Sequence, residues 1–449
     1  MGLFFGTDGI RGEFQKDMTA ELCYRCANAL SKQKQGAKIL IAKDTRASGD
    51  FLMMSFVLGA IAGGMKVSVL GLCPTAGVSY LTKKHGFDFG VVISASHNSA
   101  EFNGIKIMDK NGVKIDEKIE REIEKNLIYL KTKSLSKLGS VKFCDELLKE
   151  YEEFLIGETK KELGEKCDFS GLKIVLDCSN GAAFQIAPKI FESFGAKLFV
   201  VGTKPDGLNI NKNCGSLHIS KLQTEVIRQC ADIGFAFDGD SDRLIAVAHD
   251  GTVVDGDGLI YIFAKHYSEQ KKLKKKMVVG TKHTNMGVQK ALEDIGIKMI
   301  RTDIGDRFVS EALENNNLLI GGEQSGHVFL KDKLQTGDGI LNALILAAIC
   351  SSKNKRLKEF LKFDLFYQKN ISTKVKDKQS VLNDDELQNF LKEMDNKMLG
   401  GRIMVRASGT ENLVRIMTES KNEEVADFVA NEIEKMIKNI DQKGGLCVE

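Results

Sequence analysis

The sequence has no long apolar run and almost no net charge. No apolar stretch approaches the roughly 18 residues of a membrane-spanning helix, and the first residues lack the charged start and apolar centre of a secretory signal. The 64 lysines and arginines nearly balance the 61 aspartates and glutamates, so no global field exists to hold nucleic acid or a membrane. We therefore expect a cytoplasmic protein with neither of these partners, which must hold any anionic ligand locally.

Two sequence patterns that would indicate nucleotide binding or zinc binding are also missing. The chain contains no Gly-Lys dipeptide, which excludes a Walker-type nucleotide loop. Its ten cysteines are scattered, and the one close pair, Cys23 and Cys26, has no second pair to complete a zinc site. We expect these thiols to be buried and reduced, as in a reducing compartment.

The chain is too long for one hydrophobic core, because single cores stop growing at about 250 to 300 residues. Short apolar runs alternate with helix-length segments in three successive blocks, a pattern that predicts α/β units with mixed or parallel sheets. The predicted strands are 38–43, 66–71 and 90–94, then 172–177, 197–201 and 233–237, then 277–280, 298–302 and 318–321.

The order of elements changes after residue 363. A strand and an acidic-start helix are followed by strands at 402–406 and 413–418 and a closing helix at 423–440, which predicts a smaller α+β unit. A charged helical stretch at 146–165 separates the first two blocks. The predicted domains are therefore three α/β domains at 1–155, 156–255 and 256–365, and an α+β domain at 366–449.

The clearest chemical motif is DGDSDR, which begins at Asp238 and follows an apolar strand. Its alternating carboxylates, on Asp238, Asp240 and Asp242, are hard oxygen donors that suit Mg²⁺ and repel one another without a cation. A calcium EF-hand loop is excluded, because its glycine and glutamate positions hold Arg243 and His249. An acidic solvated turn is the alternative to a metal site.

A second motif, SASHN, begins at Ser94 at the end of a predicted strand, where α/β folds place ligand sites. Taken alone, Ser-His-Asn is a common turn, and adjacent Ser and His do not form a hydrolase triad. Further candidates for anion binding combine flexible backbone with arginine or hydroxyl donors. They are the segments 6–12, 44–46, 321–327 and 406–410, and each alone is more simply an ordinary turn.

Taken together and in this order, the segments GTDGIRG, SASHN, DGDSDR, GEQSGH and RASGT resemble the α-D-phosphohexomutase superfamily. The resemblance runs from Phe5 to beyond Arg415, and the members of this superfamily have four domains around one central cleft. It implies that Ser96 is a phosphoserine, and that its phosphoryl group and the three aspartates of DGDSDR hold one Mg²⁺. Arg11 and Arg243 would stabilise the transferring group, with Lys106 as a general acid or base.

The resemblance also implies a reaction and a binding site for the sugar. Phospho-Ser96 would pass its group to a hexose monophosphate and take back the other phosphate, with a hexose 1,6-bisphosphate as priming activator. Closure of the last domain would exclude water. The implied substrate-binding residues are Glu323, Ser325 and His327 for the sugar, Asp306 and Arg307 beside them, and Arg406, Ser408, Gly409, Thr410 and Arg415 for the distal phosphate.

Gln324 and the runs 304–308 and 336–339 resemble the branch of the superfamily that acts on glucosamine phosphates. This implies an amino-sugar phosphate as the small-molecule partner, interconverted between its 6- and 1-phosphates, with Glu323 against the ammonium group. Activity on mannose or glucose phosphates is the alternative, and the unusual segment 282–285 leaves it open. The oligomeric state is also open, with a homodimer as one alternative.

Two rivals from other classes remain. A haloacid-dehalogenase-type phosphatase would use Asp238 as its nucleophile, but Ser241 stands where that family usually has Thr or Val. A non-catalytic sugar-phosphate binder would be expected to have lost Ser96, Lys106 or an aspartate of DGDSDR, and all are present. The chain has only three prolines, and Ser99 is one of the positions where the superfamily commonly has proline, so looser loops are expected.

Overall fold

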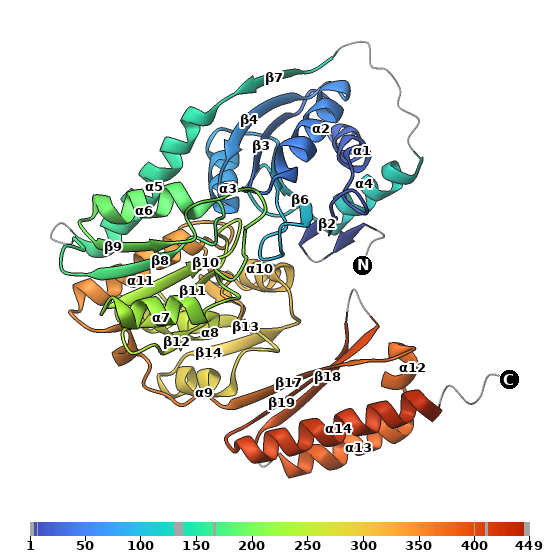
Figure 1. Cartoon of the computed structure of the whole chain (residues 1–449), viewed down its shortest axis with the longest axis vertical. Helices are drawn as coiled ribbons and strands as arrows, with labels where there is room; N and C mark the ends of the chain where they lie inside the picture. Colours follow the sequence, from blue (N-terminus) through green and yellow to red (C-terminus); the bar gives the residue numbers. More distant parts are fainter. Residues whose placement is uncertain are drawn as a thin grey trace. The chain divides into compact units, whose positions relative to one another are not determined.

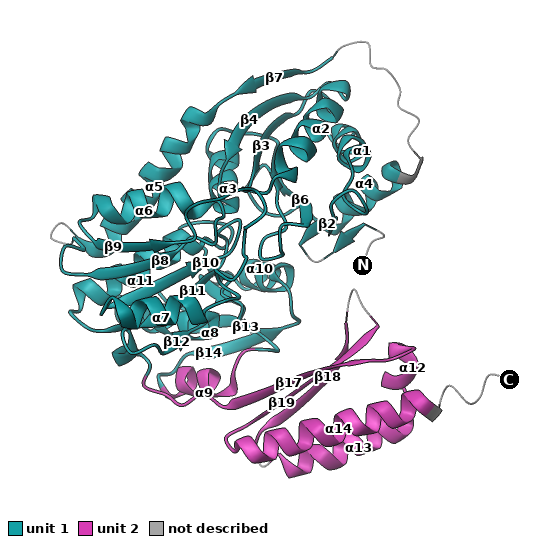
Figure 2. Ribbon diagram, in the orientation of Figure 1, with its two compact units in different colours: residues 1–283, 295–361 teal, residues 284–294, 362–449 magenta. Residues whose placement is uncertain are grey.

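The computed structural model describes residues 4–6, 8–129, 138–164, 168–398, 400–408 and 412–443. It divides into two compact units (Figure 2), of which the first comprises residues 1–283 and 295–361 and the second residues 284–294 and 362–449. The first unit contains three separate sheets and the second contains one. This agrees with the predicted class of three α/β domains followed by a smaller α+β domain.

The first sheet is mixed and has the strand order β1-β2-β6-β5-β3-β4-β7. Its strands are β1 (Phe5–Gly6), β2 (Gly9–Glu13), β3 (Lys38–Lys43), β4 (Lys66–Leu72), β5 (Phe89–Ile93), β6 (Phe102–Asp109) and β7 (Ser140–Phe143). Its helices are α1 (Ala20–Ser31), α2 (Ser48–Ala62), α3 (Thr75–Lys84) and α4 (Glu117–Tyr129). The three predicted strands are confirmed, each within one residue of the observed bounds.

Strand β6 was not predicted from the sequence, although it carries Lys106. It runs antiparallel to β5, with Val92 opposite Lys106. The strand buries Asn103 and Lys106 among its apolar residues, so it does not show the apolar run of a buried strand. The pairing holds Lys106 beside the end of β5, from which the SASHN loop departs.

The second and third sheets each combine parallel strands with antiparallel ones. The second has the order β12-β11-β10-β8-β9, with β8 (Lys173–Asp177), β9 (Lys197–Val201), β10 (Ile233–Phe237), β11 (Leu244–Ala248) and β12 (Val253–Val254). The third has the order β14-β13-β15-β16, with β13 (Met277–Thr281), β14 (Lys298–Thr302), β15 (Ile320–Gly322) and β16 (Val328–Leu330). The helices around them are α5 (Leu148–Leu163), α6 (Ala183–Ser193), α7 (Ser220–Arg228), α8 (Gly256–Glu269), α10 (Asp306–Asn315) and α11 (Gly339–Ser352).

Helix α11 is apolar on all sides and is buried from Gly339 to Cys350. A helix with this pattern belongs inside a protein core. Asp338 caps its start, since the carboxylate accepts a hydrogen bond from the Leu341 amide at 2.9 Å. The amide of Gly339 donates to the carbonyl of Ser241 at 2.9 Å, so the buried helix begins directly at the DGDSDR loop.

The second unit is an antiparallel sheet of order β17-β19-β18 with helices on one face (Figure 1). It consists of β17 (Tyr367–Lys374), α12 (Lys378–Leu382), α13 (Asp385–Lys397), β18 (Arg402–Ala407), β19 (Leu413–Ser420) and α14 (Glu423–Lys443). Helix α9 (Met286–Asp294) belongs to it as well, because Asn285 exchanges two hydrogen bonds with the backbone of Phe366 and the Met286 amide donates to Glu419.

Eight cysteines in the described part of the chain are free thiols, and seven of these are buried, as expected for Cys23 and Cys26. Burial raises the pKa of Cys23 to about 12, so that thiol is unreactive. None of the helices in the described ranges combines the length and apolar character that a bilayer crossing requires.

Helices α1 and α2 approach so closely that Gly59 has no room for a side chain. A Cβ atom there would lie 2.1 Å from the carbonyl oxygen of Tyr24. Gly59→Ala should therefore separate the two helices and destabilise the protein by about 1–3 kcal/mol. Gly157 is the matched control, because a Cβ in the middle of α5 meets nothing within 4 Å.

Gly157→Ala should stabilise α5 by about 0.5–1 kcal/mol, since alanine loses less backbone entropy in a helix. The urea midpoint of unfolding, compared among the two variants and the parent protein, measures both effects. Equal midpoints for the two variants would contradict the close approach of α1 and α2.

Candidate active site

Three of the predicted motifs connect antiparallel strands of the first unit. SASHN lies between β5 and β6, DGDSDR between β10 and β11, and the 323–327 segment between β15 and β16. A short connection between paired strands holds its side chains more rigidly than a free loop, because both of its ends are fixed by the sheet.

Ser96 is buried and points toward the DGDSDR loop. Its Oγ donates a hydrogen bond to Oδ2 of Asp238 at 2.5 Å, although the two residues are 142 positions apart. His97 Nδ1 lies 3.3 Å from the same Oγ. Burial and the neighbouring Arg243 lower the pKa of His97 to about 3, so its ring is neutral. The structure thus brings the serine and the acidic loop together as the sequence analysis expected.

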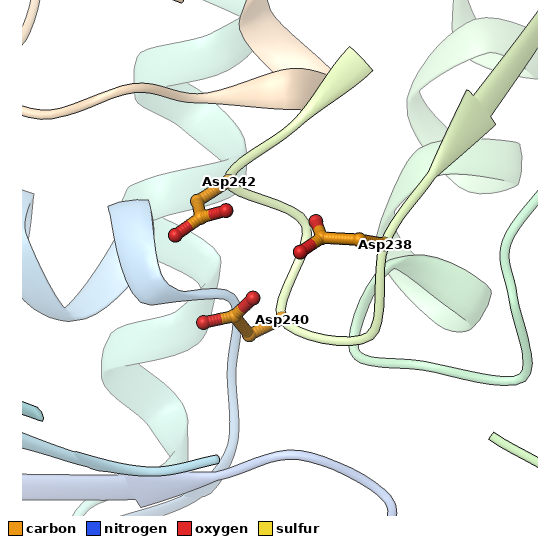
Figure 3. A group of neighbouring side chains, drawn as sticks. All are labelled: Asp238, Asp240 and Asp242. Atoms are coloured by element: carbon orange, nitrogen blue, oxygen red, sulfur yellow. The ribbon is translucent and has the colours of Figure 1, made fainter. Parts of the chain in front are cut away.

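The three aspartates of DGDSDR converge in the protein interior (Figure 3). All are buried, and one carboxylate oxygen of each lies within 4.8 Å of the others. Burial and the nearby Asp242 and Asp240 raise the pKa of Asp238 well above its usual value. Oδ1 of Asp240 and Oδ1 of Asp242 are buried without a hydrogen-bond partner. Unsatisfied hard oxygens at this spacing fit a divalent metal ion.

Lys106 supplies positive charge to this cluster from β6. Its Nζ lies 2.7 Å from Oδ2 of Asp240, 2.8 Å from Oδ2 of Asp242 and 3.1 Å from Oδ2 of Asp8. Burial alone would lower the pKa of Lys106, but these three carboxylates raise it well above its usual value. Lys106 is therefore an ammonium ion in this arrangement.

Arg243 and Arg11 lie close to the same carboxylates. The backbone amide of Arg243 donates to Oδ1 of Asp238 at 3.1 Å, and its Nε lies 3.9 Å from Oδ1 of Asp242. Arg11 pairs with Asp8. The Nε atoms of both arginines are buried without a hydrogen-bond partner, so each retains a donor for an anion.

The connection 323–327 contacts both the DGDSDR loop and the strand that follows it. The amide of Leu244, the first residue of β11, donates to the carbonyl of Gly326 at 3.0 Å. His327 Nδ1 lies 3.5 Å from Oδ1 of Asp242. Burial alone would lower the pKa of His327, but Asp242 raises it to about 9. Part of this predicted sugar-binding segment therefore contacts a predicted metal ligand.

The carboxylate and hydroxyl of the same connection retain binding capacity. Oε1 of Glu323 accepts a hydrogen bond from the Gly305 amide at 3.0 Å, and burial raises its pKa. Oγ of Ser325 and Nε2 of His327 are buried with no hydrogen-bond partner. Groups of this kind are suited to the hydroxyls of a polar ligand.

Asp306 and Arg307 begin α10, and only the first lies toward the cluster. Oδ1 of Asp306 is 3.7 Å from Nζ of Lys114, which also lies 3.7 Å from Oδ1 of Asp8. Arg307 instead forms ion pairs with Glu120 and Glu117 of α4. Its predicted contact with substrate stays a prediction.

Arg46 has a structural role that differs from the anion binding expected of the 44–46 segment. It is fully buried, and its Nε donates to Oδ2 of Asp44 at 2.9 Å. Its other nitrogens donate to four backbone carbonyls around the serine loop, those of Ser96, Asn98, Ser99 and Phe102. The guanidinium has no capacity left for a phosphate.

Sequence reasoning also missed Thr75 and Asn211, which reach the two central loops from elsewhere. Thr75, the first residue of α3, donates from Oγ1 to Oδ2 of Asp240 at 2.6 Å. Asn211 donates from Nδ2 to the carbonyls of Ser96 and Asn98, both at 2.9 Å. Neither residue lies in a motif, and no sequence signal would have identified them.

The remaining predicted residues lie in the second unit. Arg406 on β18 is directly opposite Arg415 on β19. Burial and Arg415 lower the pKa of Arg406, as expected where two like charges face each other. Ser408 is buried at the end of β18 and its Oγ has no hydrogen-bond partner. Gly409 and Thr410 lie outside the described residues.

Comparison with known proteins gives a consistent result along the chain. Models described as phosphoglucomutase/phosphomannomutase, alpha/beta/alpha domains I, II and III, match residues 2–133, 149–251 and 255–365. The model of the C-terminal domain matches residues 371–436. The chain is 41% identical to the phosphoglucosamine mutase of Alkaliphilus oremlandii (strain OhILAs), over 98% of this chain and 99% of that protein.

Two solved structures resemble the chain at low identity and bear on the fold alone. A phosphoglucomutase/phosphomannomutase family protein from Burkholderia thailandensis gives a TM-score of 0.79 at 21% identity, covering 97% of each chain. The Aspergillus fumigatus N-acetylphosphoglucosamine mutase in complex with GlcNAc-6P and magnesium gives 0.68 at 17% identity, covering 98% of this chain and 96% of that one.

A divalent cation should stabilise the folded protein by relieving the repulsion among the three aspartates. At a concentration 100 times its dissociation constant, Mg²⁺ should add about 2.7 kcal/mol to the free energy of unfolding. The thermal unfolding midpoint, measured with Mg²⁺ and with a chelator, checks this. Asp240→Asn should lose most of the shift, whereas Asp250→Asn at the exposed turn after β11 should keep it. Equal shifts in the two variants would contradict a metal site at the DGDSDR loop.

Proposed function

This chain belongs to the phosphoglucomutase/phosphomannomutase family, and we infer that it interconverts glucosamine 6-phosphate and glucosamine 1-phosphate. It is an isomerase that works by phosphoryl transfer. The full-length similarity to a phosphoglucosamine mutase favours this substrate over glucose and mannose phosphates. The observation that carries the mechanism is the hydrogen bond from the Ser96 hydroxyl into the buried aspartate cluster.

We propose that Ser96 carries the phosphoryl group between the two ends of the sugar. The Ser96 phosphate is passed to the free hydroxyl of the sugar monophosphate, so a new bond to phosphorus forms as the bond to Oγ breaks and its electrons return to Oγ. The proton lost by the sugar hydroxyl ends on Oγ, and the products are a sugar bisphosphate and a free serine hydroxyl. The bisphosphate turns over, and its other phosphoryl group is transferred to Oγ. A hexose 1,6-bisphosphate would prime unphosphorylated protein by the second of these steps.

The metal would be Mg²⁺, held by Asp238, Asp240, Asp242 and an oxygen of the Ser96 phosphate, and it would neutralise charge on the transferring group. Oδ1 of Asp240 supports this assignment, because it is buried with no hydrogen-bond partner.

Lys106, Arg11 and Arg243 would act on the transferring group directly. Lys106 is charged in this environment, so its ammonium group would stabilise charge on the transferring group, and it would also be the general acid or base of the step. The two arginines would stabilise the equatorial oxygens with the Nε donors that the protein leaves unused. Neutral His97 beside Oγ would not add a competing positive charge.

We propose that the sugar is bound by Glu323, Ser325 and His327, with Asp306 and Arg307 at the edge of this site. Glu323 would pair with the sugar ammonium group. The distal phosphate would be held by the second unit. Arg406 and Arg415 support this, because two guanidinium groups on neighbouring strands are suited to one dianion, with Ser408, Gly409 and Thr410 completing the loop.

The phosphatase alternative is less well supported by the geometry. A nucleophilic Asp238 needs a free carboxylate oxygen facing the substrate. Here Oδ2 of Asp238 accepts from Ser96 and Oδ1 accepts from the Arg243 amide.

The proposed domain division is 1–155, 156–255, 256–365 and 366–449, and the four sheets support it. A cytoplasmic location is proposed with it, and the free buried thiols support this.

Ser96→Ala should abolish almost all turnover, because the protein then has no oxygen to carry the phosphoryl group. Ser99→Ala is the matched control in the same loop, since the Ser99 side chain is exposed. It should retain the activity of the parent protein. Mutase kinetics, together with mass spectrometry of protein treated with hexose 1,6-bisphosphate, measure both. Full activity in Ser96→Ala, or a phosphate located on Asp238, would overturn the mechanism.

Glu323→Gln should weaken the use of glucosamine phosphate selectively. The substitution keeps the shape of the side chain and removes the charge that would pair with the sugar ammonium group. We expect kcat/KM for glucosamine 6-phosphate to fall about tenfold more than for glucose 6-phosphate, the size of one lost partly buried charge interaction. Mannose 6-phosphate serves as a second neutral reference. Equal losses on all three sugars would exclude Glu323 as the residue that selects the amine.

A further inference from the structure

The backbone of Ser96 is held in an unusual conformation. Its φ is +52°, in the left-handed region that residues other than glycine seldom adopt. Such a conformation persists only where the surroundings enforce it, and it often marks a functional position. The hydrogen bonds around Ser96 identify the groups that enforce it.

The backbone N–H and C=O groups of Ser96 are both hydrogen-bonded by buried side chains. The Ser96 amide donates to Oγ of Ser94 at 2.9 Å. The Ser96 carbonyl accepts from Nη2 of Arg46 at 3.0 Å and from Nδ2 of Asn211 at 2.9 Å. The same two nitrogens donate to the carbonyl of Asn98, at 2.8 and 2.9 Å. Two carbonyls of one turn are therefore fixed twice each.

Asn211 reaches this turn from a different part of the chain. It lies in the loop between β9 and α7, is buried, and has a φ of +59°. The backbone amide of Asn211 donates to the carbonyl of Ser179 at 2.9 Å. A Cβ on Gly239, within DGDSDR, would lie 2.6 Å from the Ser96 carbonyl oxygen and 3.1 Å from Nδ2 of Asn211. The SASHN loop, the DGDSDR loop and the side-chain amide of Asn211 are thus in close contact.

We propose that Asn211 is a positioning residue for phosphoryl transfer. Its side-chain amide fixes the Ser96 peptide in the left-handed conformation and so directs the Ser96 Oγ at Asp238. This rests on the proposed function of Ser96. The physical reason is that rotation of the Ser96 peptide would move Oγ, and a displacement of about 1 Å can cost about a hundredfold in rate.

Asn211 can be altered with less disturbance than Arg46. Removal of Arg46 would leave Asp44 unpaired in the interior as well as freeing four carbonyls, so loss of folding would be difficult to separate from loss of function. Asn211→Asp keeps the size of the side chain and its tolerance of positive φ, and it replaces the donor with an acceptor.

The matched control is Asn213→Asp. Asn213 lies two residues further along the same loop, has a φ of +54°, and is exposed to solvent. The experiment measures kcat and KM for glucosamine 6-phosphate, the melting temperature, and the rate at which hexose 1,6-bisphosphate phosphorylates Ser96. Asn211→Asp should lower kcat and the phosphorylation rate about 10- to 100-fold, with KM within about threefold of the control. Asn213→Asp should match the parent protein.

If Asn211→Asp does not fold, Asn211→Gly and Asn213→Gly give the same comparison without the added charge. A kcat for the Asn211 variants equal to that of the Asn213 controls would overturn the inference while leaving the proposed function intact. A kcat loss accompanied by an equal change in KM would also overturn it, because that pattern marks a binding defect. Absence of mutase activity in the parent protein would overturn the proposed function, and this inference with it.

Discussion

Repulsion among three buried carboxylates is the constraint on which the rest of this structure depends. Asp238, Asp240 and Asp242 lie together in the interior, and none could remain charged there without nearby cations. Part of the compensating charge comes from Lys106, which reaches across from β6 of the first sheet to the loop of the second. Two sheets that share no strand are thereby linked by ion pairs.

Within the first unit, connections between antiparallel strands explain how short segments far apart in the sequence can form one site. β1 and β2, β5 and β6, β10 and β11, β15 and β16, and β18 and β19 are each antiparallel pairs, and each pair carries one motif. In the connections that the structure describes completely, between β5 and β6, β10 and β11, and β15 and β16, the two flanking strands are hydrogen-bonded to each other, so the backbone of the connection has little freedom. Hydrogen bonds from Ser94, Arg46 and Asn211 to the Ser96 peptide then hold its left-handed backbone.

Apolar periodicity was enough to locate the buried strands, because β3, β8 and β10 are continuous apolar runs. It failed for β6, where Lys106 interrupts the buried apolar residues Ile105, Ile107 and Met108 and is itself buried with its ion pairs. The contact between Ser96 and Asp238 joins residues 142 positions apart, and only the resemblance to a family indicated it. Arg46, Thr75 and Asn211 act through backbone carbonyls or another residue's carboxylate, and such contacts leave no spacing or motif in a sequence.

The buried helix α11 links the stability of the core to the charge of the site. Its first amide, that of Gly339, donates to the carbonyl of Ser241, so the positive end of the helix dipole lies against the acidic loop. Tyr151 of α5 donates to Oδ2 of the capping Asp338 at 2.9 Å, which fixes this end further. Burial raises the pKa of Asp338 to about 6, and backbone amides and Tyr151 oppose that rise. The apolar body of the helix thus fixes a partial positive charge beside the carboxylates. A core substitution that shifts α11 would therefore displace this charge from the DGDSDR loop.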